Sequence, residues 1–110
     1  MKSVPERDWK LFTRLHPIAL DRYCRSVLEK AGAILSRSEG DSHKTYLALY
    51  KFLQKQDEEL GQIFNDYRRS TAFFQIAMMY DRNLLTEEEF QEFSPETVNM
   101  ILGLRNGFGN

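Results

Sequence analysis

The chain has 110 residues, of which 42% are hydrophobic, 28% charged and 13% aromatic, a composition typical of one folded globular domain. It excludes intrinsic disorder, because a chain with this many apolar and aromatic side chains can bury enough surface to fold. The formal net charge of −1 excludes an overall basic protein, although the charge is uneven, at +5 over residues 1–55 and −6 over residues 56–110.

The cysteine count and the N-terminal residues bear on the cellular compartment. Cys24 is the single cysteine, so no internal disulfide can form, which favours a reducing environment. Glu6, Arg7 and Asp8 lie where a signal peptide needs an apolar core, and no apolar run approaches the roughly 20 residues of a membrane span. We therefore expect a cytoplasmic protein without a membrane partner.

The first third of the chain predicts two helices. Ser3, Pro5 and Glu6 have the spacing of a capping box, which predicts a helix over residues 4–15. His16 and Pro17 have the form of a cap followed by a first-turn proline, which predicts that a second helix begins there. That helix would bury one apolar stripe, made of Leu20, Cys24, Val27, Ala31, Ile34 and Leu35.

The next segment predicts a loop and a third helix. Residues 36–42 contain a glycine and no apolar side chain, as loops do. Asp41 or Ser42 would cap the third helix, in which apolar residues recur at spacings of three and four as far as Tyr67. Polar residues 54–59 and the following Gly61 leave open a break or kink at residues 56–61.

Residues 67–82 predict a fourth helix, whose segment 72–80 is apolar on every side apart from Gln75. A helix of this kind must be covered all round. We expect it to be the central helix of a bundle, or a helix that a second chain covers.

The C-terminal residues predict two short helical segments. A turn at residues 83–85 precedes Thr86 and Glu89, which form a second capping box, and Ser94 with Pro95 opens a last helix that ends near residue 104. Residues 106–110 should fray, which leaves residues 1–105 as one helical domain. The predicted fold class is all-α, a compact orthogonal or up-down bundle of five to six helices.

Residues 76–93 resemble the short helical hairpins of SHOCT-type domains, in which a helix and a turn precede threonine, acidic residues and phenylalanine. The resemblance covers less than a fifth of the chain, with Asn83 at a position where those domains commonly carry glycine and without their basic second helix. We interpret it as shared capping chemistry; kinship would imply an oligomerisation or tethering role.

No catalytic or metal-binding constellation stands out, so we expect a non-enzyme without cofactor or metal. The nearest metal pattern places Asp81, Asn83, Glu89 and Glu92 at EF-hand spacing, but Leu85 and Thr86 occupy the positions of a ligand and of the essential glycine. The histidines are His16 and His43, and neither belongs to a known nucleophile or zinc motif. A small enzyme of unrecognised class remains an alternative.

A nucleic-acid-associated regulator is the second function considered. Its contacts would come from cations on the polar sides of the second and third helices: Arg22, Arg25, Lys30, Lys44 and Lys51. The chain as a whole is not basic, and Asp21 lies four residues before Arg25, where it neutralises part of that charge. We therefore regard a nucleic-acid partner as the weaker hypothesis.

The favoured hypothesis is a protein-interaction or regulatory module that binds a protein partner or a second copy of itself. Aromatic and methionine side chains make strong, adaptable contacts, and two arginines at a helix N-terminus oppose its dipole unless an acidic partner is near. The interface candidates are Phe73, Phe74, Met78, Met79, Tyr80, Arg68 and Arg69. The hypothesis applies to those of the four Phe and Met residues that cannot face inward.

Overall fold

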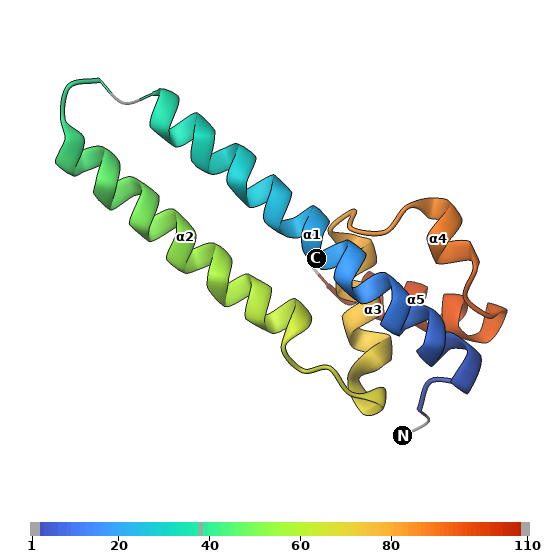
Figure 1. The fold of residues 1–110 in the computed structure, drawn as a ribbon. Helices are drawn as coiled ribbons and strands as arrows, with labels where there is room; N and C mark the ends of the chain where they lie inside the picture. Colours follow the sequence, from blue (N-terminus) through green and yellow to red (C-terminus); the bar gives the residue numbers. More distant parts are fainter. Residues whose placement is uncertain (1–2, 38, 109–110) are drawn as a thin grey trace.

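The computed structural model describes residues 3–37 and 39–108, and within these ranges the chain forms five α-helices, one 3-10 helix and no strand (Figure 1). The predicted all-α bundle is confirmed. The elements in chain order are α1 (Glu6–Ser36), α2 (Ser42–Phe64), the 3-10 helix η1 (Arg69–Thr71), α3 (Ala72–Asp81), α4 (Glu87–Gln91) and α5 (Pro95–Asn106).

The two long helices, α1 and α2, form an antiparallel hairpin, and the other helices gather around the N-terminal half of α1 (Figure 1). α3 packs along α5 and also contacts both hairpin helices. The molecule is elongated, with extents of 54 × 24 × 23 Å. The far half of the hairpin therefore projects beyond the region where the other helices pack.

α1 is one continuous helix of 31 residues, so the predicted boundary between two helices at His16 and Pro17 is wrong. Pro17 lies inside α1 on its exposed side, while Leu15 and Ala19 on either side of it are buried. Packing on that face holds the helix together where proline removes one backbone hydrogen bond. The predicted capping box is also wrong, because Pro5 is the N-cap and no side chain caps α1.

α2 runs without interruption through the segment where a break was left open. Asp41 is its N-cap and accepts a hydrogen bond from the Lys44 backbone N–H at 3.1 Å, as predicted. Gly61 lies within the helix, and a side chain added there would meet only the flexible Asn65. Of the polar residues before it, Gln54, Lys55, Asp57 and Glu58 are exposed, whereas Gln56 and Glu59 are half-buried.

α3 is the central helix of the core, although it begins at Ala72 and not near Tyr67 as predicted. The residues directly before α3 form the short 3-10 helix η1 and not a further turn of α-helix. Seven of the ten residues of α3 are buried, among them Gln75. The expectation of a central helix is therefore met within one chain, and Phe74 is the large α3 side chain that remains exposed.

The predicted caps of the last two helices are confirmed. Thr86 and Glu89 form the capping box of α4, and the Ser94 side chain accepts from the Thr97 N–H at the start of α5. Asn83 in the turn before them has a left-handed backbone, with φ of 59°. α5 extends two residues past its predicted end, and the ring of Phe108 lies 5.5 Å from that of Phe74. In the described residues no helix is both long and apolar enough to cross a membrane.

Candidate functional site

The projecting part of the hairpin differs from the rest of the molecule in burial. We call residues 24–37 and 39–62 the arm, and the remaining described residues the base. Among the described residues of the arm, not one is buried, whereas the base contains the whole buried core. Two helices alone provide each other with too little cover to bury large side chains completely.

The arm is held together by a seam of half-buried residues at helical spacing. On α1 these are Val27, Ala31 and Ile34, and on α2 they are Thr45, Leu49, Phe52 and Gln56. At the end of the seam nearest the base, Tyr23 of α1 links the two helices. Its hydroxyl lies 3.0 Å from the Gln56 carbonyl oxygen and 3.1 Å from a Glu59 carboxylate oxygen. Burial raises the pKa of Tyr23, and its hydrogen bond to the Glu59 carboxylate raises it further.

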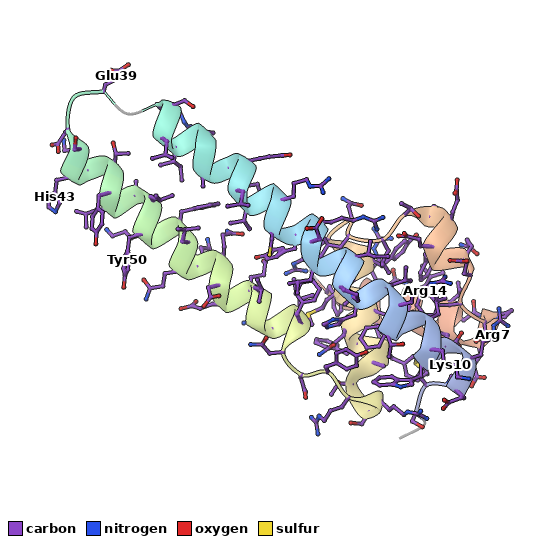
Figure 2. All side chains as sticks on the ribbon, in the orientation of Figure 1. Arg7, Lys10, Arg14, Glu39, His43 and Tyr50 are labelled. Carbon is purple, nitrogen blue, oxygen red and sulfur yellow. The ribbon has the colours of Figure 1, made fainter. Side chains whose placement is uncertain are left out.

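A second apolar stripe runs along each arm helix beside the seam and is exposed, apart from the half-buried Cys24. Together the two stripes form what we call the hairpin face: Cys24, Leu28 and Leu35 from α1, with Tyr46, Tyr50 and Leu53 from α2. Leu28 is 68% exposed, Tyr46 is 64% exposed, and Leu35 and Tyr50 are each 56% exposed. Figure 2 shows the Tyr50 side chain turned away from α1, so it takes no part in the seam.

Both stripes lie on the same side of the hairpin. Cys24, Leu28 and Leu53 line one groove of about 350 Å³ between the helices, together with Val27, Asp57 and Leu60. The other side of the hairpin is polar: there Ser26 and Lys30 line a smaller hollow beside Glu59 and Arg82, which are ion-paired at 3.4 Å. The hairpin is therefore amphipathic across its two sides.

Most of the interface candidates from the sequence lie inside the base. Phe73, Met78 and Met79 are buried in the core, so they are not available to a partner. The Tyr80 ring stacks on Phe90 at 3.8 Å, and its hydroxyl donates to Glu87. Phe74 alone among the apolar candidates is exposed, at 48%, with Phe108 beside it.

The two arginine candidates have partners within the chain. Arg68 donates two hydrogen bonds to Asp66, two residues before it. Arg69 pairs with Glu6 at 2.5 Å, and its guanidinium lies over the Trp9 ring, 5.2 Å from the centroid. These contacts account for the arginines at the start of α3 without an external acidic group.

The nucleic-acid candidates divide into two groups. Arg22 forms a two-pronged ion pair with Glu89, at 2.7 and 3.0 Å, and Arg25 pairs with Asp21 at 3.0 Å. The hydrogen bond to Glu89 raises the pKa of Arg22 and lowers that of Glu89. Lys30, Lys44 and Lys51 are exposed arm residues, and their side chains form no ion pair within the described ranges.

The residues considered for catalysis or metal binding are dispersed. His16 packs among the rings of Phe12, Phe64 and Tyr67, and burial lowers its pKa. Cys24 lies eight residues further along α1, about 12 Å along its axis, so the two do not meet. Within residues 3–37 and 39–108, no three His, Cys, Asp or Glu side chains are placed to hold a metal ion.

The hairpin face was missed from the sequence, although the sequence contains its signal. The intervals between Cys24 and Leu28, and between Tyr46, Tyr50 and Leu53, are the three- and four-residue steps of a helix-pairing seam. The predicted buried stripe includes Cys24 and Leu35 but not Leu28, and spacing alone does not show what covers a helix. Comparisons with protein-family models, with curated proteins and with solved structures find no match to this chain.

Proposed function

We propose that this protein is a non-catalytic protein–protein interaction module that binds its partner through the hairpin face. The observation that carries the proposal is the exposed apolar stripe on an arm that contains no buried side chain among its described residues. The base already has a closed core around α3, so it is the arm that lacks cover.

The chemistry of the hairpin face suits binding better than solvent exposure. Contiguous apolar surface on a protein is unfavourable in water and usually marks an interaction site. Tyrosine and leucine side chains bury a large area, and tyrosine also offers a hydroxyl that can be hydrogen-bonded inside an interface. A partner that covers this face would complete the core that two helices cannot form alone.

The test is the assembly state of the protein in cells of the source organism. Tagged protein expressed at its natural level is separated by native size-exclusion chromatography, together with Leu28→Glu and the matched variant Ala33→Glu. Ala33 is exposed on the same helix, on the side opposite to Leu28. We expect wild type and Ala33→Glu to elute in a larger assembly and Leu28→Glu to elute as a monomer. Monomeric wild type would contradict the proposal.

A further inference from the structure

We infer that the hairpin face is covered by the hairpin face of a second copy, so that two arms pack antiparallel as a four-helix bundle. The inference rests on the proposed function and names its partner. A pair of identical surfaces related by a twofold axis requires that one surface be complementary to itself. Spacing, charge and size together meet that requirement here.

The spacing of the exposed stripes is that of helices packed lengthwise. On α2, Tyr46, Tyr50, Leu53, Asp57 and Leu60 follow one another at intervals of four, three, four and three. On α1, Cys24, Leu28 and Leu35 follow at four and seven, and Ala31 of the seam lies between Leu28 and Leu35. This alternation is the pattern of knobs-into-holes packing at small crossing angles. With the seam beside it, each arm helix has two apolar stripes, as a helix with two neighbours in a four-helix bundle requires.

The charges on α2 distinguish the direction of pairing. Asp57 and Glu58 lie at its lower end, whereas His43 and Lys44 lie at the tip of the arm. Parallel copies would place acidic end against acidic end, which is repulsive. Antiparallel copies place the two Asp57 carboxylates toward opposite ends of the face, so these like charges are kept apart. Lys44 lies on the opposite side of α2 and takes no part in the contact.

One antiparallel register aligns the stripe residues of the two copies on α2 and on α1 at the same time. If Tyr50 is level with Leu53 of the second copy, Tyr46 is level with its Asp57. Asp57 is exposed and forms no hydrogen bond or ion pair within the described ranges, and in this register the Tyr46 hydroxyl donates to its carboxylate. A single polar pair in an apolar seam is a known means of setting register.

The same register holds on α1. The hydrogen bonds from Tyr23 to Gln56 and Glu59 place residue 23 of α1 level with residues 56–59 of α2. The point midway between Tyr50 and Leu53 is then level with the segment that follows Leu28 on α1. A twofold axis there brings Leu28 beside Ala31 of the second copy, and Cys24 beside its Leu35.

The area is sufficient for a specific dimer. The α2 stripe runs from Tyr46 to Leu60, so the face is about 21 Å long, and two helices make it about 20 Å wide. Two such faces in contact remove on the order of 1,000 Å² of accessible surface, which is the lower limit for a specific interface.

The first experiment measures the mass of the purified 110-residue protein by light scattering and analytical ultracentrifugation over a wide concentration range. We expect a dimer of twice the 13.0 kDa chain mass. Leu28→Glu and Leu53→Glu should each weaken it by about a hundredfold or more in Kd, because a charge is buried without a partner. Leu28 and Leu53 are exposed in the single chain, so circular dichroism of both variants should report intact helices. The control variant Ala33→Glu should still dimerise.

The second experiment determines direction with spin labels in a Cys24→Ala background. Labels are attached at Lys44→Cys or at Lys51→Cys, two exposed positions seven residues apart on the same side of α2. In the antiparallel register the two Lys44 labels are offset along the axis by about 22 Å and the two Lys51 labels by about 2 Å. The Lys44 pair should therefore be measurably farther apart, whereas parallel pairing would make the two distances equal.

Three results would overturn the inference. Equal label distances would exclude the antiparallel bundle. A dimer that survives Leu28→Glu and Leu53→Glu but is lost in Phe74→Glu would place the contact on the base. Purified protein that stays monomeric would exclude a second copy, and if the assembly in cells still depended on Leu28, the proposed function would stand with a different partner.

Discussion

Asp8 is a buried carboxylate that links the start of α1 to the start of α5. It accepts hydrogen bonds from the Ser94 backbone N–H at 2.9 Å, the Ser94 hydroxyl at 2.6 Å and the Thr97 hydroxyl at 2.5 Å. Burial raises the pKa of Asp8, but these hydrogen bonds together outweigh burial, so its pKa lies below the ordinary value. Nothing in the sequence around Asp8 predicts this role, because its partners are more than 80 residues away.

Asp8→Asn should destabilise the protein at neutral pH by about 1–3 kcal/mol, because an amide group then faces three hydrogen-bond donors. The folded-state pKa is lowered, so the stabilisation is complete above the unfolded value of about 3.9 and is lost as the pH falls through the folded value. The difference between wild type and Asp8→Asn should therefore shrink below about pH 4. Urea unfolding from about pH 7 to about pH 3 measures it.

The control for that prediction is Asp21→Asn. Asp21 is exposed and pairs with Arg25 on the helix surface, where such pairs contribute little. Its replacement should change stability by less than about 0.5 kcal/mol. A difference between wild type and Asp8→Asn that stays constant across the same pH range would show that the Asp8 charge is not involved.

At the scale of the elements, α1 shows that tertiary packing can override a helix boundary signal. A proline normally ends a helix or begins one, yet α1 continues through Pro17. The buried face on either side includes Phe12, Leu15 and Ala19, and their packing spans the proline. The helix-breaking tendency of one proline is smaller in free energy than the burial of these apolar side chains.

Pro17→Ala should therefore stabilise the protein. Alanine restores the missing N–H donor and removes the ring clash within α1, and we expect a gain of about 1–2 kcal/mol after the extra freedom of the unfolded chain is included. Chemical denaturation measures the gain. Pro95→Ala is the matched control, because Pro95 lies in the first turn of α5, where proline is favourable, and its loss should bring no gain. Destabilisation by Pro17→Ala would mean that a bend at Pro17 is needed to align the buried face.

At the scale of the whole molecule, stability is unevenly distributed. The base contains every buried residue in the described ranges, while the arm depends on a half-buried seam and on the bonds of Tyr23. Regions with few buried apolar contacts open locally at lower free energy than the core. The arm of an isolated chain is therefore the region expected to open first.

Native-state hydrogen exchange tests this distribution. In the Leu53→Glu variant, amides in residues 30–36 and 46–52 should be at least about tenfold less protected than those of α3. In wild type, protection in these arm segments should rise with protein concentration as dimer forms, while protection in α3 should stay the same. Arm amides as protected as α3 in dilute Leu53→Glu would show that the seam alone stabilises the arm.

The sequence by itself determined the helical class, the caps at Asp41, Thr86 and Ser94, and the central place of α3. Each depends on residues a few positions apart, through a capping hydrogen bond or the distribution of apolar side chains around one helix. Only the tertiary structure decided that α1 crosses Pro17, that Asp8 is buried and that the arm projects with one apolar stripe uncovered. Those features depend on contacts between distant parts of the chain, and the periodicity of a helix is the same whether its apolar side faces a core or solvent.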